Sequence, residues 1–214
     1  MKIGILGSGD VAKSLGAGLR RKGHDVMLGT SDPAKLAAWA AGSGGVRTGS
    51  FADAAAFAEL AVLAVKGTAA VAAVKAAGAQ ALAGKPVIDA TNPIADKPPV
   101  NGVLQFFTGP NESLLETLQR EFAAVHFVKA FNSVGSAHMI DPQFAGGAPT
   151  MFIAGNDDAA KAAVATLVRD AGWEVADMGR AEAARAIEPL CMLWCIPGLL
   201  RNEWSHAFKL VKPR

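Results

Sequence analysis

The N-terminal end constrains the fold of this chain more than any other segment. Residues 2–6 form a short apolar run that leads directly into Gly7-Ser8-Gly9-Asp10-Val11-Ala12, and a helix-like stretch continues to residue 21. This is the G-x-G-x-x-A spacing of the turn that joins a strand to a helix in dinucleotide-binding proteins. Because strand, turn and helix occur in the right order, the segment predicts an α/β fold with a dinucleotide site.

Each small residue of this turn has a physical role. Gly7 permits the tight turn, Gly9 lets the backbone approach a pyrophosphate, and Ala12 lets the helix pack closely on the strand. The free N–H groups and the dipole at the helix start favour phosphate charge. In the alternative interpretation the glycines only tighten a strand–helix turn, which predicts the same local fold without a ligand.

Short β-branched runs alternate with alanine-rich helical stretches, which is typical of a parallel sheet covered by helices on both faces. Several runs are almost continuously apolar, as strands buried on both faces are. We expect a Rossmann-type doubly wound, mostly parallel sheet in an α/β fold. The expected strands are 2–6, 25–28, one near Val46, 60–65, 86–91 and 126–131, and the expected helices are about 10–22, 33–41, 51–58, 67–82 and 113–122.

The Gly146-Gly147 pair marks the expected end of this first domain. We therefore divide the chain into an NADP-binding Rossmann domain at 1–146 and a small C-terminal αβ/helical domain at 147–214. The second domain would complete the acceptor site and offer a possible dimer surface. Its expected elements are a strand at 150–154, a helix at 157–171, a strand at 173–177 and one or two further helices that carry His206.

Composition narrows the class of protein. The net charge of +2 and the 19% of charged residues give no sign of a nucleic-acid surface. The first strand begins at residue 2, and the apolar run Pro189–Leu200 is shorter than a bilayer requires. Cys191 and Cys195 lie among apolar residues and make a poor metal site, so we expect reduced core thiols. These features favour a cytoplasmic protein without a metal, nucleic-acid or membrane partner.

The end of the second strand bears on the choice of dinucleotide. An NAD-specific fold usually places a carboxylate there, but this strand ends in Gly29-Thr30-Ser31. Thr30 and Ser31 offer hydroxyl donors, and Lys35 lies one helical turn beyond the Asp32-Pro33 cap, so the sequence favours NADP(H). In the alternative interpretation these residues only cap the helix, Lys35 is solvated, and Asp32 reaches a ribose.

Missing residue types narrow the chemistry further. The chain has no tyrosine, which excludes a Tyr–Lys proton relay, and the segment after residue 146 is small for a separate carbonyl pocket. A reduced cofactor carries the difficult step itself, so an acceptor such as a flavin-like ring would need little acid–base help. A structural role is favoured for every histidine. His138, close after the strand at 126–131, and Lys66 are the weak candidates for a proton donor.

Four segments together resemble the family of coenzyme F420-dependent NADP oxidoreductases and their bacterial relatives. They occur in order and span nearly the whole chain, and the nucleotide-binding part also resembles the cytoplasmic reductase part of membrane ferric reductases. The four segments are 4–36 with the glycine turn, Val-Ile-Asp-Ala-Thr-Asn-Pro-Ile at 87–94, Val-Lys-Ala-Phe-Asn-Ser-Val at 128–134, and Ala-Ile-Glu-Pro-Leu at 186–190 with Leu193-Trp194.

The resemblance implies roles for residues that follow the strands. The pyrophosphate would lie against Gly7, Ser8, Gly9, Asp10 and Val11, and the 2′-phosphate against Thr30, Ser31 and Lys35. Val65 and Lys66 would line the ribose–pyrophosphate side. The nicotinamide and the acceptor ring would be framed by Asn92-Pro93 and Ala130-Phe131-Asn132. The residues themselves also allow a plainer interpretation, in which Asn92 forms a turn before proline and Asn132 caps a helix. Ser31 replaces the arginine that is usual in the family, which weakens the argument for NADP.

Three hypotheses of function follow. The first is an oxidoreductase that passes hydride directly between NADP(H) and F420 or another flavin-like acceptor, without a protein nucleophile. The second is a reductase of a small imine or carbonyl, which would need a proton donor such as His138 or Lys66. The third is a non-enzymatic NADP(H) sensor that uses the Pro189–Leu200 helix as a docking or dimer surface.

Overall fold

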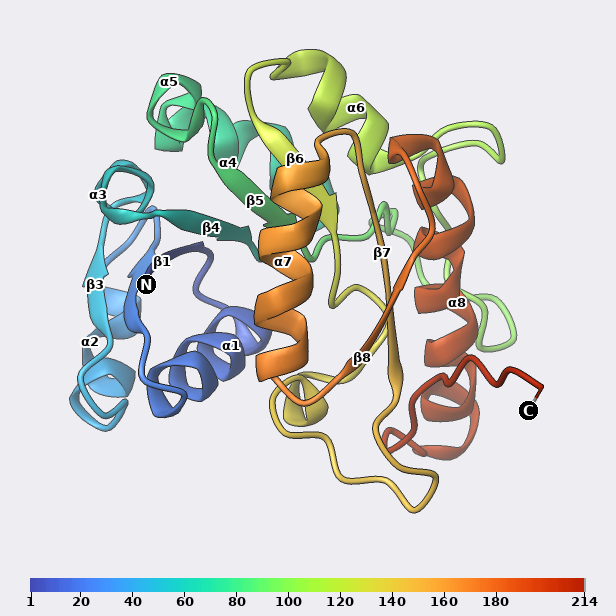
Figure 1. The fold of residues 1–214 in the computed structure, drawn as a ribbon. Helices are drawn as coiled ribbons and strands as arrows, with labels where there is room; N and C mark the ends of the chain where they lie inside the picture. The colour runs from blue at the N-terminus through green and yellow to red at the C-terminus, as the bar shows by residue number, and fades with distance from the viewer. Residues whose placement is uncertain (214) are drawn as a thin grey trace.

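One eight-stranded sheet runs through the molecule, with helices on both of its faces (Figure 1). The computed structural model describes residues 1–213. The strands are β1 Lys2–Leu6, β2 Asp25–Gly29, β3 Arg47–Gly49, β4 Leu60–Leu63, β5 Pro86–Asp89, β6 His126–Lys129, β7 Thr150–Gly155 and β8 Glu174–Asp177. Their order in the sheet is β3-β2-β1-β4-β5-β6-β7-β8. The first six follow the doubly wound dinucleotide-binding order, which confirms the expected fold class.

The helices also follow the expected positions, with two differences. They are α1 Asp10–Arg21, α2 Ala34–Ala41, α3 Phe51–Phe57, α4 Ala70–Ala77, α5 Ala79–Leu82, α6 Leu114–Glu121, α7 Asp158–Asp170 and α8 Ala184–Arg201, with 3-10 turns η1 Gly67–Ala69, η2 Ser136–His138 and η3 Ala181–Ala183. The expected helix at 67–82 is divided, because Gly78 takes a φ of 80° between α4 and α5. His206 does not lie on a helix, because Asn202 ends α8 in the left-handed conformation.

The strands β4, β5 and β6 each end two residues earlier than expected. At the end of β5, Asp89 Oδ1 accepts a 2.9 Å hydrogen bond from the backbone N–H of Thr91, which turns the chain out of the sheet. The apolar residues just beyond β5 and β6, Ala90 and Ala130, are nevertheless buried. They pack in the same core cluster as side chains of α1 and α7, so their hydrophobicity reflects helix packing instead of strand pairing.

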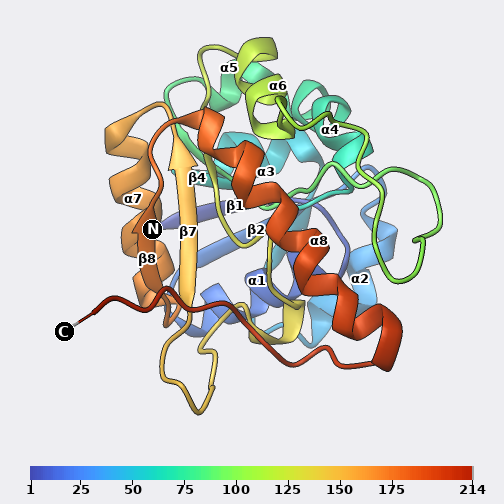
Figure 2. The same cartoon turned by 90° about the vertical axis from the view of Figure 1, so that its right-hand side faces the viewer.

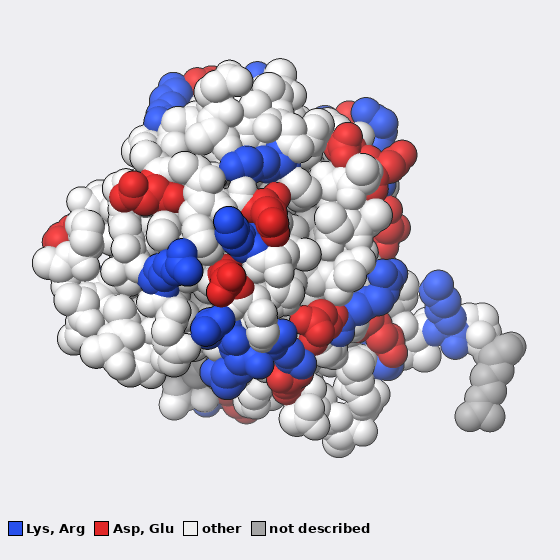
Figure 3. Space-filling view, turned by 60° about the vertical axis from the view of Figure 1, so that its left-hand side comes forward, with Lys and Arg blue, Asp and Glu red and all other residues white. Residues whose placement is uncertain are grey.

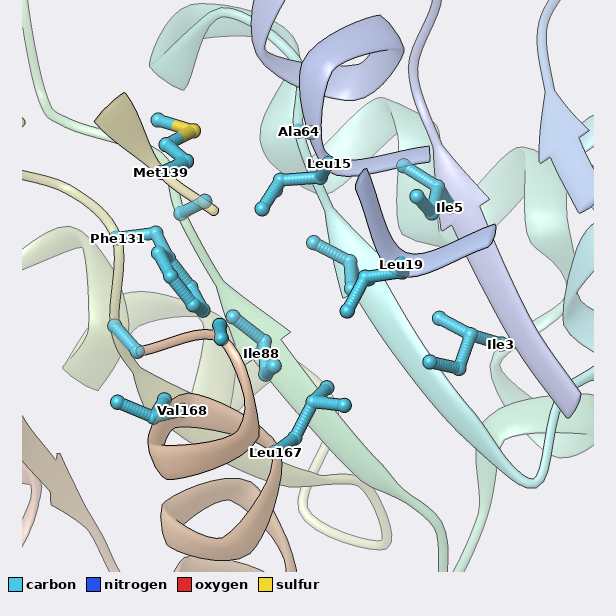
Figure 4. Close-up of a cluster of buried hydrophobic side chains, with 14 of the residues drawn as sticks. Ile3, Ile5, Leu15, Leu19, Ala64, Ile88, Phe131, Met139, Leu167 and Val168 are labelled. Carbon is cyan, nitrogen blue, oxygen red and sulfur yellow. The ribbon is translucent and has the colours of Figure 1, made fainter. Parts of the chain in front are cut away.

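The apolar side chains divide between the two faces of the sheet. On one face, Leu15 and Leu19 of α1 lie near Ile3 and Ile5 of β1, and Phe131 reaches toward Ile88 (Figure 4). The other face is covered by α3, α4 and α6, whose small or leucine side chains pack on the remaining strand residues. Successive apolar side chains along a strand thus pack on opposite faces, as expected of a sheet that helices bury on both sides.

The C-terminal segment extends the same sheet. β7 pairs antiparallel with β6, and β8 pairs parallel with β7. α8 crosses the side of the molecule that faces the viewer in Figure 2. The division at residues 146 and 147 stays a prediction. By length and composition alone, Ala181–Arg201 could cross a membrane, and 33% of that window is buried against the rest of the protein.

Charged side chains of both signs are mixed on the face shown in Figure 3. The basic run at the end of α1 illustrates this. Arg20 lies 3.4 Å from Asp25, and Lys22 lies 2.5 Å from Asp141. Exposed pairs of this kind contribute about 0–1 kcal/mol each to stability. The run therefore forms a solvated helix end with local ion pairs.

Candidate functional site: a dinucleotide cleft at the carboxyl edge of the sheet

The glycine turn has the geometry that the sequence predicts. Gly7 has a φ of 151°, and a side chain there would overlap the carbonyl oxygen of Ala64 at the end of β4. Its backbone N–H donates a 2.9 Å hydrogen bond to the carbonyl oxygen of Gly29, at the end of β2. Gly9 is different, since no atom lies within 4 Å of where its Cβ would be. The fold itself therefore requires a glycine at position 7. At position 9 the fold would accept a side chain, and the glycine instead leaves open space beside the start of α1.

A cleft of about 500 Å³ opens at this turn. It is lined by Ser8, Gly9, Asp10, Val11, Ala64, Val65, Lys66 and Ala90. Six of the predicted cofactor residues thus lie together, whereas Gly7 and Ala12 are buried beneath them. The N-terminus of α1 is exposed at Gly9 and Asp10, and free N–H groups at a helix start favour a phosphate. The cleft therefore fits the pyrophosphate of a dinucleotide.

The residues predicted to contact a 2′-phosphate lie where β2 meets α2. Thr30 is buried, and its Oγ1 accepts a 3.2 Å hydrogen bond from the N–H of Asp32. Asp32 Oδ1 in turn accepts one from the N–H of Ala34. Ser31 and Lys35 are exposed, and Lys35 Nζ lies 3.9 Å from Asp32 Oδ2. Thr30 and Asp32 therefore shape the turn, whereas the side chains of Ser31 and Lys35 are exposed to solvent.

Two asparagines join the loops after β5 and β6. Asn92 Nδ2 donates a 2.7 Å hydrogen bond to the carbonyl oxygen of Asn132, and Asn132 Nδ2 donates to Asn92 Oδ1 at 3.1 Å. Asn132 Nδ2 also donates to the carbonyl oxygen of Ile187 in α8 at 3.0 Å. No helix begins at Asn132, so the expectation that it caps one is wrong. The buried Asn132 Oδ1 has no hydrogen-bond partner among the described residues.

Phe131 has a strained backbone beside this pair. Its φ of 60° is rare for an aromatic residue, and its N–H points to the sulfur of Met151 at 3.0 Å. The ring is buried and meets Trp173 edge-on, with 6.4 Å between the ring centroids. A conformation of this kind costs about 1–3 kcal/mol and persists where surrounding packing enforces it. The contacts of Phe131 with Trp173 and Met151 therefore hold the backbone that leads into Asn132 in one conformation.

The remaining predicted residues divide between the cleft and its surroundings. Pro93 and Ala130 are buried supports, and Pro93 accepts a hydrogen bond from the N–H of Phe107. Lys66 lines the cleft with its side chain 83% exposed. His138 is not among the residues that line the cleft. Its Nε2 lies 3.0 Å from Ser205 Oγ, and its ring lies beside Phe144.

A buried group of three charges lies behind the asparagines and was missed by sequence reasoning. Lys129 Nζ is 2.6 Å from Asp89 Oδ2 and 2.8 Å from Glu188 Oε1, and all three side chains are at most 1% exposed. Burial lowers the pKa of Lys129, but the two carboxylates outweigh this and hold its pKa above the ordinary value. The sequence does contain a signal for this group, because Asp89, Lys129 and Glu188 each stand in an otherwise apolar run, where charged residues are rare unless they are paired.

A family model described as NADP oxidoreductase, coenzyme F420-dependent, matches residues 2–93. A candidate F420-dependent NADP reductase from Arthrobacter sp. FB24, known from a crystal structure, is 37% identical. Its TM-score with this chain is 0.92, and the match covers 99% of this chain and 100% of that one. The chain belongs to the family of F420-dependent NADP oxidoreductases. It is therefore an NADP-dependent oxidoreductase, which confirms the resemblance stated from its motifs.

Two further proteins are more distantly similar to this member of the F420-dependent NADP oxidoreductase family. The metalloreductase STEAP3 of Rattus norvegicus is 32% identical over 210 residues, which cover 93% of this chain and 39% of STEAP3. The chain thus spans well under half the length of that relative. An imine reductase of Streptomyces aurantiacus has a TM-score of 0.70 at 15% identity, covering 94% of this chain and 63% of that one. At this identity the likeness concerns the fold alone.

Proposed function

We propose that this protein transfers hydride directly between NADP(H) and a deazaflavin such as F420, or another flavin-like ring. One observation carries the proposal. The open turn at Gly9 and the asparagine pair Asn92–Asn132 lie at the same carboxyl edge of the sheet, after the neighbouring strands β1, β4, β5 and β6. In open α/β sheets, ligands bind in the crevice at this edge.

The residues at one end of the site would bind the dinucleotide. The start of α1 presents backbone N–H groups at Gly9 and Asp10 to the pyrophosphate, and the helix dipole adds to their attraction. Ser31 and Lys35 would meet the 2′-phosphate, where a charge-assisted contact contributes about 1.5–3 kcal/mol. Asp32 competes for Lys35 at 3.9 Å, so the preference for NADP depends on Lys35 exchanging that partner.

The residues at the other end would orient the nicotinamide. The amide groups of Asn92 and Asn132 are held to one another and to α8, and the buried oxygen of Asn132 still needs a donor. The carboxamide of a nicotinamide supplies such a donor. When bound, NADPH supplies the hydride. The protein then has to hold two rings about 3–3.5 Å apart, and positioning of this kind needs no nucleophile.

A different acceptor remains the second candidate. Lys66 lines the cleft and its ammonium is largely exposed, so it could give a proton to a small imine or carbonyl. His138 is the other candidate donor. A protein that only senses NADP(H) would bind both redox forms and transfer nothing. In each case we propose a small-molecule ligand and a cytoplasmic location.

Anaerobic mixing of the purified protein with NADPH and F420 tests the proposal. We expect loss of the visible absorbance of the deazaflavin, with FMN as a parallel acceptor. Gly146→Ala is a suitable control, because this glycine lies outside the cleft and has open space around it. Tight NADPH binding without reduction of F420 or FMN would contradict direct ring-to-ring transfer and favour an imine or carbonyl reductase, or a sensor.

A further inference from the structure

The buried charges behind the asparagine pair are joined to one another by ion pairs. Lys129 Nζ also donates a hydrogen bond, of 2.9 Å, to the carbonyl oxygen of Thr91. The same ammonium forms ion pairs with Asp89 Oδ2 and Glu188 Oε1, so Lys129 meets three oxygen atoms from three residues. Asp89 ends β5, Thr91 lies in the turn that follows it, and Glu188 lies on α8. We call Lys129, Asp89 and Glu188 the buried ion triad.

The triad reaches Asn92 through the turn after β5. Asp89 Oδ1 accepts hydrogen bonds from the Thr91 N–H at 2.9 Å and from the Thr91 hydroxyl at 2.6 Å. Asp89 Oδ2 has the Lys129 ammonium as its partner. Thr91 is therefore held at its N–H, its hydroxyl and its carbonyl oxygen. The next residue is Asn92, so the triad fixes the backbone from which that amide projects.

The triad reaches Asn132 through α8. Glu188 Oε1 accepts from Lys129 and from the N–H of Leu115, while Oε2 accepts from the N–H of Leu114 at the start of α6. The residue before Glu188 is Ile187, whose carbonyl oxygen accepts from Asn132. The same turn of α8 therefore binds both the triad and the asparagine pair.

Stability alone does not explain three buried charges. A buried ion pair is often no more stabilising than apolar side chains of similar volume, although removing one partner is costly. The gain of such a group lies in geometry, because each hydrogen bond fixes a direction as well as a distance. Here the geometry that is fixed belongs to the two amides beside the proposed nicotinamide site.

We infer that the buried ion triad is a positioning group for hydride transfer, which holds the Asn92–Asn132 amides in place and makes α8 part of the active site. The inference rests on the proposed function, because it requires the nicotinamide to lie beside these amides. Lys129, Asp89 and Glu188 are buried and do not line the cleft at the glycine turn. They act through Thr91 and Ile187.

Two variants test this role from opposite ends of the triad. Glu188→Gln weakens the link to α8, and Thr91→Val removes one hydroxyl from Asp89 while keeping all three charges. Arg185→Gln is the matched control on the same helix, because it breaks the exposed 2.6 Å ion pair between α8 and Glu116 of α6 without touching the triad. Circular dichroism would establish that each variant is folded.

Binding of NADPH and of 2′,5′-ADP separates positioning from general damage. 2′,5′-ADP carries only the adenosine end, so we expect its Kd to stay within about twofold of wild type in both triad variants. The Kd for NADPH should rise about two- to tenfold, as for loss of one hydrogen bond. Single-turnover reduction of F420 should slow by about tenfold to a hundredfold, since small misplacements of reacting groups are costly. The fluorescence of bound NADPH should change as well, which needs no acceptor.

The outcomes distinguish this inference from the proposed function. A wild-type protein that binds neither NADPH nor 2′,5′-ADP would overturn both. Normal wild-type binding, with Glu188→Gln and Thr91→Val indistinguishable from wild type, would overturn the positioning role alone. Equal defects in Arg185→Gln would also overturn it, because any loosening of α8 would then suffice. If Glu188→Gln does not fold, Thr91→Val decides.

Discussion

Asn92 and Asn132 lie forty residues apart in the chain, yet the amide of Asn92 donates a 2.7 Å hydrogen bond to the backbone carbonyl of Asn132. Each follows a different strand of the parallel sheet, and the strands β5 and β6 are neighbours. The carboxyl ends of parallel strands meet at one edge, which brings the two loops together. Asn132 also donates to Ile187, so the pair joins this edge of the sheet to α8 at the point where the proposed chemistry occurs.

We predict that Asn92→Ala reduces the affinity for NADPH by about two- to tenfold, because one hydrogen bond contributes about 0.5–1.5 kcal/mol. The Asn132 amide would lose its hydrogen bond to Asn92 and keep only the one to the carbonyl oxygen of Ile187. Isothermal titration calorimetry with NADPH and 2′,5′-ADP measures the effect. An equal loss for both ligands would contradict a role at the nicotinamide end.

The two glycines of the turn should behave oppositely when changed to alanine. Gly9→Ala should leave the fold intact, since open space surrounds its Cβ position, but should weaken NADPH binding by blocking close approach. Gly7→Ala should destabilise the protein, because its φ of 151° disfavours a side chain and the new Cβ would overlap Ala64. The conformational part alone amounts to about 1–3 kcal/mol.

Thermal unfolding and NADPH titration of both glycine variants check this pair of predictions. Gly146→Ala, which has open space and lies outside the cleft, serves as the control. A Gly9→Ala protein with wild-type affinity for NADPH would show that the pyrophosphate does not approach the turn.

The sequence predicts those parts of the site that depend on residues close together in the chain, and it does not predict contacts between distant segments. The glycine turn and most elements depend on neighbours in the chain, so spacing was enough to place them. Gly78 shows the limit, because its φ of 80° divides a continuous alanine-rich pattern that predicts one helix. The link between Asn92 and Asn132 depends on which strands are adjacent, and sequence motifs alone placed both residues without pairing them.

The buried ion triad was beyond local reasoning for a physical reason. Each of Asp89, Lys129 and Glu188 is a charged residue in an apolar run, which by itself indicates either a strand end or a buried charge. Asp89 and Lys129 meet because they are register partners in the neighbouring strands β5 and β6, and Glu188 reaches Lys129 from α8, far away in the sequence. The short ends of β4 to β6 were missed similarly, because residues beyond them are buried by helices.

We predict that Lys35→Ala weakens binding of NADPH by about ten- to a hundredfold and leaves NADH binding nearly unchanged. The charge-assisted contact is available only to the 2′-phosphate. Lys75→Ala is the control, since Lys75 is an exposed helical lysine that pairs with Glu121 on another part of the protein. Equal losses for both nucleotides would refute the assignment of Lys35.

Substitution of Lys66 and of His138, the two candidate proton donors, distinguishes direct hydride transfer between rings from reduction of an imine or carbonyl. If hydride passes directly between rings, Lys66→Ala and His138→Ala should each retain F420 reduction within about threefold of wild type, since no general acid is needed. General acid catalysis contributes about a hundredfold or more, so a loss of that size in either variant would favour an imine or carbonyl reductase. Steady-state rates at saturating NADPH make the comparison.

The last prediction concerns the pH dependence of stability. Burial lowers the pKa of Lys129, but Asp89 and Glu188 hold it above the ordinary lysine value of 10.5. Since the folded pKa exceeds the unfolded one, the ammonium's contribution is complete below pH 10.5 and is lost as pH rises through the folded pKa. Glu188→Gln removes one of the raising charges, so its folded pKa for Lys129 should lie closer to that of the unfolded chain.

Urea unfolding of wild type and Glu188→Gln from about pH 8 to about pH 11.5 measures this difference. We expect the free energy of unfolding to fall more in wild type than in Glu188→Gln above pH 10.5, because the stability lost as Lys129 titrates is proportional to the difference between its pKa values in the folded and unfolded states. The hydrogen bond with Cys195, burial and Glu188 all raise the pKa of Cys191, so this cysteine is replaced by serine in both proteins. Parallel curves would mean that Glu188 does not stabilise the charged Lys129, and the triad would then hold Thr91 and α8 through hydrogen bonds that do not depend on that charge.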